Sequence, residues 1–360
     1  MIMQLATLRH IYDAEEPLAT VYLQSQSVTA DVEHEVRLRW DALRQQLADA
    51  GAHQQMLDSL DEAILNTEDF GTIQAEGRVL VADRTGLLLE KEFDASQEAG
   101  DRAVLGPVAQ LGDYLRQRLR AVRALVVLVD KEQALLRREV FTSSDVLDSG
   151  AETHVEGSAY ESVHKVREGF LHHRRMQQRA DDAAVLNIRD VTESVRSAVA
   201  RWTPDVIAVA GESQGRKLLL EELPTDLADM AREVEAGGGI PSGSADSGAE
   251  ESLSEELATL ARKITIDRAS EQTERFGTAE GNGLAVQGAE NVFRAVRLGA
   301  VDTLLLRYSQ PAKDEDELLR AAASVDASVA LVGTNVTDHA AAVLRYQAPI
   351  DELDHEPTSG

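Results

Sequence analysis

The chain contains no cysteine among its 360 residues. This absence excludes disulfide bonds, thiolate-bound metal ions and cysteine nucleophiles. Aromatic residues make up only 4% of the sequence, so leucine, valine and alanine have to fill the cores. No apolar run reaches the ~18 residues that a membrane-spanning helix needs, and the N-terminal segment soon turns acidic, unlike a secretory signal. These features predict a cytoplasmic protein without a membrane partner.

Basic residues are scarce relative to acidic ones. The chain has 36 Lys and Arg against 63 Asp and Glu, which gives a formal net charge of −27. A charge of this sign and size repels nucleic acid at long range, so any RNA contact has to come from a local basic segment. The acidic residues themselves are expected on solvated helix faces.

The length of the chain predicts more than one domain. An α+β N-terminal domain is expected over residues 1–110 and a central α/β domain over 111–235. A C-terminal α/β domain is expected over 236–348, entered through the glycine- and serine-rich stretch 236–250. Residues 349–360 are expected to form a disordered acidic tail.

Apolar periodicity predicts the secondary structure along the chain. Residues 77–93 are expected to form a hairpin with Gly86 in its turn, and the polar stretch 142–162 is expected to be a loop. Helices are predicted over residues 31–50, 55–65, 174–202, 217–223 and 252–275, and strands over 124–129, 134–141, 205–210, 301–306 and 328–332.

Four segments carry a family resemblance, and they occur in the family's order. They are PDVIAVAGESQGRKLLLEELP (204–224), VEAGGGIPSG (234–243), GNGLAVQGAENVFRAVRLGAVDTLLL (281–306) and HAAAVLRY (339–346). Together with the preceding strand pair and long helix, they resemble the release factor/Pelota superfamily, in its bacterial branch of archaeo-eukaryotic-type release factor homologues. The resemblance covers residues 110–347 and implies a three-domain α/β architecture with an L7Ae-like C-terminal domain.

The family's catalytic Gly-Gly-Gln loop is absent. Gly237-Gly238-Gly239 precedes Ile240 and lies in the linker, whereas the family's loop lies before the long central helix, at residues 164–179 here. Gly169 is the only glycine there, and His173 stands where relatives carry their first glutamine. The basic and amide-bearing residues of this segment are nevertheless suited to phosphates and nucleotides. The RNA-binding residues that we predict are His172, His173, Arg174, Arg175, Gln177, Gln178 and Arg179.

Three functions follow as alternatives. The first is a ribosome-binding factor that occupies the A site in hibernation or rescue, without peptide release. The resemblance implies two partners: the 70S ribosome, bound through its RNA and the P-site tRNA, and elongation factor Tu. The protein itself is expected to be a monomer. The second is a peptidyl-tRNA hydrolase or tRNA-cleaving rescue factor that uses His173 or Gln177, since histidine can act as a base near neutral pH. The third is a stress adaptor outside the ribosome, because a fold does not fix a function.

Other patterns give weaker candidates. GESQG at 211–215 matches the nucleophile elbow of serine hydrolases, with Ser213 as nucleophile and His339 as base. The arginines at 116, 118, 120 and 123 are interpreted as a solvated helix face with some phosphate contact. His154, His164, His172 and His173 are irregularly spaced, so neither a metal site nor a cofactor is predicted.

Overall fold

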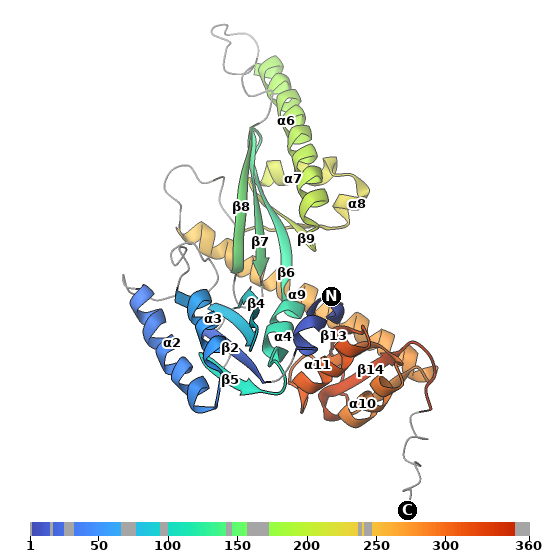
Figure 1. Ribbon diagram of the computed structural model, residues 1–360. Helices are drawn as coiled ribbons and strands as arrows, with labels where there is room; N and C mark the ends of the chain where they lie inside the picture. The colour runs from blue at the N-terminus through green and yellow to red at the C-terminus, as the bar shows by residue number, and fades with distance from the viewer. Residues whose placement is uncertain are drawn as a thin grey trace, which may run out of the picture. The chain divides into compact units, whose positions relative to one another are not determined.

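The computed structural model describes residues 2–14, 17–24, 32–65, 77–93, 100–141, 146–156, 173–236, 240 and 247–349. Helices and strands alternate in it (Figure 1), so the predicted mixed α/β class is confirmed. The chain divides into two compact units: Met1–Arg120 with Thr265–Gly360, and Ala121–Ile264. The three-domain division and the L7Ae-like nature of the last domain stay predictions.

The first unit contains an antiparallel sheet of four strands in the order β4-β3-β2-β5. The apolar side chains of its central strands β2 and β3 alternate between two faces, and both faces of these strands are buried. One face packs on the helices α2 and α3 around the buried Trp40, whose indole N–H donates to Asp61. The bounds are β2 Leu18–Gln24, β3 Gly77–Asp83, β4 Gly86–Glu92, β5 Arg102–Gly106, α2 Val32–Asp49 and α3 Gln54–Leu65.

A second sheet of the same unit has the order β1-β13-β12-β14-β11. The amphipathic helices α10 and α11 cover one face, and the C-terminal turns of α9 cover the other through Phe276 and Ala279. The bounds are β11 Ala285–Gln287, α10 Ala289–Arg297, β12 Val301–Arg307, α11 Glu315–Ser324, β13 Ser328–Val332, η3 Thr337–His339 and β14 Ala340–Leu344. The strands predicted at 301–306 and 328–332 are therefore present.

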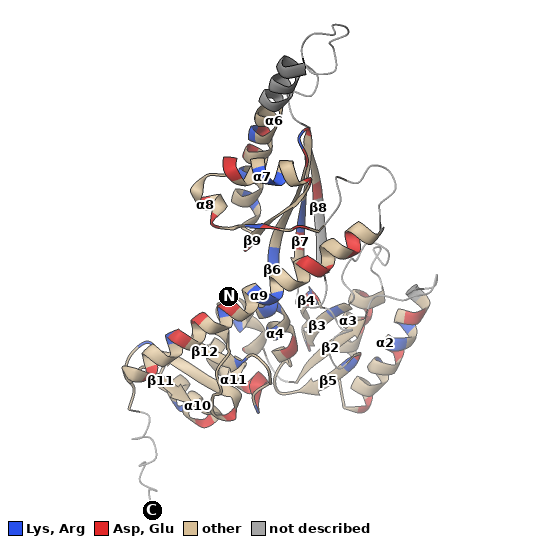
Figure 2. Cartoon of the chain, turned by 180° about the vertical axis from the view of Figure 1, so that it is seen from behind, with Lys and Arg blue, Asp and Glu red and all other residues tan. Residues whose placement is uncertain are grey.

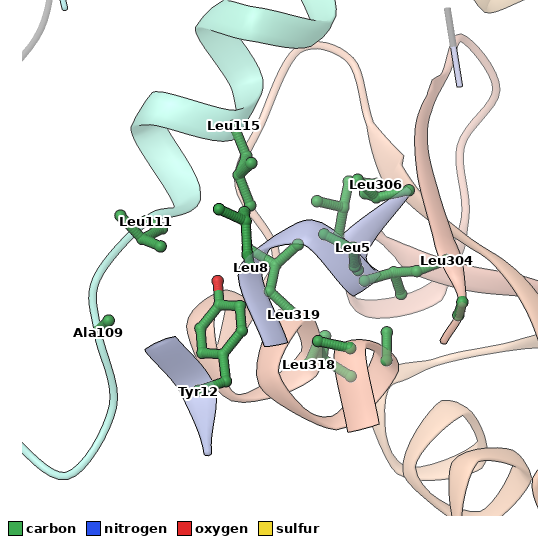
Figure 3. Close-up of a cluster of buried hydrophobic side chains, with 14 of the residues drawn as sticks. Leu5, Leu8, Tyr12, Ala109, Leu111, Leu115, Leu304, Leu306, Leu318 and Leu319 are labelled. Atoms are coloured by element: carbon green, nitrogen blue, oxygen red, sulfur yellow. The ribbon is translucent and has the colours of Figure 1, made fainter. Parts of the chain in front are cut away.

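The N-terminal segment belongs to this second sheet, although the sequence suggested that residues 1–110 form one body. Strand β1 (Met3–Gln4) pairs antiparallel with β13, with Met3 opposite Val329. The following turns, η1 (Leu5–Leu8) and α1 (Arg9–Tyr12), carry Leu5, Leu8 and Tyr12 into the core. Figure 3 shows these side chains among leucines of β12 and α11, with Leu111 and Leu115 of the α4 region (α4, Gly112–Arg120) beside them.

The second unit is built on a five-stranded sheet in the order β10-β9-β6-β7-β8. Strands β10, β9 and β6 are parallel, whereas β7 and β8 continue it as an antiparallel meander. Helices α6 and α7 pack on one face and the N-terminal turns of α9 on the other. The bounds are β6 Val122–Val129, β7 Gln133–Phe141, β8 Val146–Glu156, α6 His173–Trp202, β9 Val206–Gly211, α7 Ser213–Glu222, α8 Thr225–Ala228, β10 Ala231–Glu233 and α9 Ser247–Gly281.

Strand β8 corrects one prediction. Residues 142–162 were expected to form a loop, because they are polar and contain glycine and serine, yet Val146–Glu156 is a strand. Its backbone pairs with β7, for example Thr153 opposite Leu136. Glu152, Thr153 and His154 are exposed, so this strand is held by its ladder hydrogen bonds at the sheet edge and needs no apolar alternation.

Candidate nucleic-acid interface

The predicted RNA-binding residues lie at the start of the longest helix of the second unit. Helix α6 begins at His173, so His173, Arg174, Arg175, Gln177, Gln178 and Arg179 belong to its first turns. Their side chains are not described, and His172 lies outside the described residues. The long helix predicted over 174–202 is present with nearly the same bounds.

An apolar stripe attaches the rest of α6 to the sheet. Its members recur every three or four residues and are buried: Ala184, Ile188, Val191, Val195 and Ala198. They pack on the β6 and β7 side chains that point to the same face, among them Leu125, Val127 and Leu136. This spacing places them on one side of a 3.6-residue helix, as the sequence predicted.

A polar contact fixes the helix where the stripe begins. The buried side chain of Asn187 donates through Nδ2 to the carbonyl oxygen of Lys131 at 3.2 Å. Lys131 lies in the tight turn between β6 and β7, at one end of the sheet. Because α6 begins roughly four turns before Asn187, the segment with the predicted RNA-binding residues starts well before this point of attachment.

Charge and helix polarity both favour an anion at this end of α6. The first amide N–H groups of a helix have no intrahelical acceptor, and the helix dipole places partial positive charge there. Arg174, Arg175 and Arg179 add three full charges within the first two turns. Such an end can bind phosphates of RNA without a metal or cofactor.

One comparison with known proteins concerns the central segment of the chain. Residues 123–282 match the model of bacterial archaeo-eukaryotic release factor family 2. The matched segment contains β6 to β10 and all of α6. Over this segment the chain is similar to bacterial archaeo-eukaryotic release factors, and in this sense it is release factor-like.

Two relatives of this release factor-like protein occur in Mycobacterium tuberculosis. The uncharacterized proteins MT2704 (strain CDC 1551 / Oshkosh) and Rv2629 (strain H37Rv) are each 29% identical to it over 317 residues, which is 84% of this chain and 78% of theirs. Among solved structures, a model of ribosome-bound archaeal Pelota and ABCE1 matches at 15% identity, with 95% of this chain and 94% of that chain covered and a TM-score of 0.40. Dom34 of Saccharomyces cerevisiae matches at 10% identity, with 96% and 94% covered and a TM-score of 0.39. These two scores add nothing to the assignment made by the family model.

The GESQG motif of the release factor-like protein has a packing explanation. Gly211 has a φ of +102°, and a Cβ there would overlap the backbone carbonyl of Val129. A Cβ on Gly215 would lie 2.9 Å from the backbone of Asp130. Both glycines therefore let the β9–α7 turn pack against the end of β6. Ser213 is exposed at the start of α7, and His339, the base considered for it, belongs to the other unit.

The arginines at 116–123 are not a solvated helix face, and this prediction was wrong. The Arg116 side chain is only 4% exposed and forms an ion pair with Glu315, Nε to Oε1 at 2.6 Å. Arg120 donates to the carbonyl oxygen of Tyr308 at 2.8 Å, and the Arg123 guanidinium lies over the Trp202 ring at 4.7 Å. Arg118 alone of the four is exposed. Arg116, Arg120 and Arg123 therefore hold the fold together and do not form a solvated face.

The acidic start of α11 also has a structural role that the sequence did not indicate. Asp316 accepts a hydrogen bond from the backbone N–H of Gly112, at the start of α4, at 2.8 Å. Burial raises the pKa of Asp316 to about 6, with the Gly112 N–H lowering it and the neighbouring Glu315 raising it. Other acidic residues remain solvated, among them those along α9, which Figure 2 shows as a series of red segments.

No helix within the described ranges combines the length and apolar character required to cross a membrane.

Proposed function

We propose that this release factor-like protein is a ribosome-associated translation factor that occupies the A site in hibernation or rescue. The observation that carries the proposal is the family match over residues 123–282 in a chain that lacks Gly-Gly-Gln. The two glycines of that motif let the backbone enter a crowded catalytic centre, and the glutamine and backbone amide stabilise the oxyanion. A member without the motif retains the means of binding but not that means of peptide release.

The contact with RNA is made by the first turns of α6. The helix is fixed to the sheet from Ala184 onward by its buried stripe and by the hydrogen bond of Asn187. A rigid attachment of this kind reduces the entropy lost when the preceding turns bind RNA. The N-terminal charges Arg174, Arg175 and Arg179 then meet the phosphates, so that a chain of net charge −27 approaches RNA through one local basic end.

The L7Ae-like C-terminal domain engages a protein, elongation factor Tu in our proposal. Acidic side chains dominate the exposed surface of the part of α9 that belongs to the first unit, including Glu271, Glu274 and Glu280. Carboxylates in this number disfavour RNA through like-charge repulsion and favour a protein surface with basic residues.

Sedimentation of the purified protein with 70S ribosomes through sucrose tests the proposal. The test variant is Arg174→Ala/Arg175→Ala/Arg179→Ala. The matched control is Arg189→Ala/Arg196→Ala/Lys217→Ala, which removes three charges from exposed positions of α6 and α7. We expect the wild type and the control to co-sediment, and the test variant to bind about tenfold more weakly or worse, because hydrogen bonds to charged groups are lost. If the two variants bind ribosomes equally well, the first turns of α6 do not contact the ribosome. A wild type that stays at the top of the gradient would overturn the proposal in favour of an adaptor outside the ribosome.

The same complexes test the hydrolase alternative. We expect the peptidyl-tRNA in them to stay intact after the wild type is added. Peptide release that disappears in His173→Ala/Gln177→Ala would instead establish a hydrolase that uses these residues.

A further inference from the structure

Two arginines lie close together on the face of the second unit's sheet that α6 covers, under the C-terminal turns of this helix. A pocket of about 260 Å³ opens there between β7, β8 and α6. Its apolar floor is formed by Leu125 and Leu136, and its polar lining by Arg138, Thr153, Ser194, Ser197, Arg201 and Glu193. None of these residues belongs to the basic start of α6, and the family resemblance gave none of them a role.

Strand register explains why these side chains converge. Residues directly opposite each other on antiparallel strands point to the same face. Arg138 lies opposite Leu125, and Thr153 lies opposite Leu136. Both leucines belong to the core under α6, so Arg138 and Thr153 point toward that helix as well. Ser194, Ser197 and Arg201 follow one another at helical spacing along α6 and complete the wall.

The two arginines keep most of their donors available. The Arg138 side chain is half-buried, and no side-chain hydrogen bond or ion pair joins it to another described residue. The Arg201 side chain has one hydrogen bond within the described part of the chain, from Nε to the carbonyl oxygen of Ser197 at 3.2 Å. A guanidinium carries five N–H donors, so the pocket presents two largely unused forks to an incoming acceptor.

The acidic residue of the pocket does not neutralise them. Glu193 forms an ion pair with Arg196, Nη1 to Oε2 at 2.8 Å. Ser194 already donates its hydroxyl to the carbonyl oxygen of Asp190 at 3.0 Å, which leaves the hydroxyls of Ser197 and Thr153 as additional donors. The lining groups that remain available to a ligand are therefore the two guanidinium groups and the two hydroxyls.

We propose that this pocket, the Arg138–Arg201 site, binds a phosphate group. A carboxylate has two acceptor oxygens and would occupy one guanidinium fork, whereas a phosphate directs several oxygens to different sides and can meet both forks and the hydroxyls. The phosphate comes either from an RNA backbone or from a free phosphate monoester. The RNA source rests on the proposed function, but the phosphate site itself does not.

The affinity for two probes tests the site. Binding of a short fluorescein-labelled single-stranded RNA is followed by anisotropy, and inorganic phosphate and pyrophosphate serve as competitors and as ligands in ³¹P NMR titrations. The test variant is Arg138→Ala/Arg201→Ala. The matched control is Arg189→Ala/Lys217→Ala, which removes the same charge from exposed positions outside the pocket. Glu193→Gln is a gain-of-binding variant, because it removes the only carboxylate among the described lining residues.

We expect the test variant to lose about tenfold or more in affinity, the control to change little, and Glu193→Gln to bind more tightly than the wild type. If the source is RNA, the plot of log K against log salt concentration also becomes less steep in the test variant. The magnitude of its negative slope decreases by about 0.7, the value for one phosphate of a single strand. If the source is a free monoester, the test variant loses phosphate and pyrophosphate in the NMR titration while its RNA affinity stays that of the control. Test and control variants that bind every probe alike, together with an unchanged Glu193→Gln, would overturn the proposal.

Ribosome sedimentation of the same variants separates this proposal from the previous one. A wild type that binds phosphate but not ribosomes supports the site and refutes the function. A wild type that binds ribosomes, with no probe affected by Arg138→Ala/Arg201→Ala, supports the function and refutes the site. Circular dichroism of each variant shows whether it is folded, and the increased affinity expected of Glu193→Gln does not depend on a destabilising change.

Discussion

The ion pair between Arg116 and Glu315 links α4 to the beginning of α11, more than a hundred residues away in sequence, and its removal should weaken the first unit strongly. The guanidinium contacts both carboxylate oxygens, at 2.6 Å and 2.7 Å. It also donates to the carbonyl oxygens of Arg307, at 2.8 Å, and Gln310, at 3.0 Å. The side chains are 4% and 7% exposed, so water does not replace these contacts when one partner is removed.

The perturbation is Arg116→Met, which keeps much of the side-chain volume but removes the charge and the donors. It leaves the Glu315 carboxylate buried, and its remaining hydrogen-bond donor among the described residues is the backbone N–H of Ala312, at 2.7 Å. Breaking a buried pair in this way costs roughly 3–5 kcal/mol of unfolding free energy, mainly through the uncompensated charge. The neighbour Arg118 is exposed, so Arg118→Met should stay within about 0.5 kcal/mol of the wild type.

The double variant Arg116→Met/Glu315→Gln isolates the charge effect. Glutamine keeps a carbonyl acceptor for Ala312 but carries no charge, so part of the loss should be recovered. We expect the double variant to be more stable than Arg116→Met alone, with a coupling energy of up to about 3 kcal/mol between the two positions. Such a recovery would show that the unpaired carboxylate, and not lost packing, accounts for most of the cost.

Urea unfolding followed by tryptophan fluorescence can measure these differences in stability for the first structural unit alone. The chain has two tryptophans; Trp40 is buried in the first unit and Trp202 belongs to the second. All variants are therefore made in a Trp202→Phe background, where emission reports only the surroundings of Trp40. Coincidence with circular dichroism of the same transition tests two-state behaviour. An Arg116→Met variant as stable as Arg118→Met would refute the reasoning, because it would mean that Arg116 is solvated as its sequence pattern suggested.

Two further predictions concern single side chains. Burial raises the pKa of Asp316 to about 6 from an ordinary value of 3.8, so its stabilising contribution is complete below pH ~4 and is lost as the pH rises through 6. In urea titrations, Asp316→Asn should therefore match the wild type near pH 4 and exceed its unfolding free energy by about 1–3 kcal/mol above pH 7. The control is Glu317→Gln, which removes an exposed carboxylate of the same helical turn and keeps the half-buried Asp316. Gly211→Ala should lower the unfolding free energy by roughly 2–6 kcal/mol, because φ is +102° and a Cβ meets the Val129 backbone. Gly277→Ala, in an open position of α9, should raise it by about 1 kcal/mol. Similar melting temperatures for these two variants would contradict the assigned packing.

Local patterns in the sequence predicted the elements that bury one continuous stripe or face. The α6 stripe from Ala184 to Ala198 and the strand Ser328–Val332 are examples, because burial against a single neighbour imposes a simple period on the apolar residues. The helix start at His173 also agrees with the prediction within one residue. The positions of the predicted RNA-binding residues on α6 were therefore accessible from sequence, although their contacts were not.

The features that the sequence did not predict depend on partners distant along the chain. Strand β1 is two residues long and acquires its register from β13, more than three hundred residues later, so its own sequence carries no strand pattern. Strand β8 is held at an edge by backbone hydrogen bonds and exposes its described polar side chains, which removes the apolar alternation. Arg116 lies in an arginine-rich helix that looks solvated, because its partner Glu315 is invisible at the level of local sequence.

The excess of acidic residues helps to distinguish structural arginines from functional ones. With 63 Asp and Glu against 36 Lys and Arg, an arginine placed at random on this chain is more often near a carboxylate than near another cation. Arg78 pairs with Glu90, Arg137 with Glu139, and Arg216 with Glu233. A half-buried arginine without such a partner, as Arg138 is within the described residues, is therefore an exception. In a protein proposed to meet RNA, the free energy of placing an uncompensated guanidinium beside the sheet is recovered when a phosphate arrives, and this makes Arg138 a more informative position for mutation than the many arginines whose carboxylates are already in place.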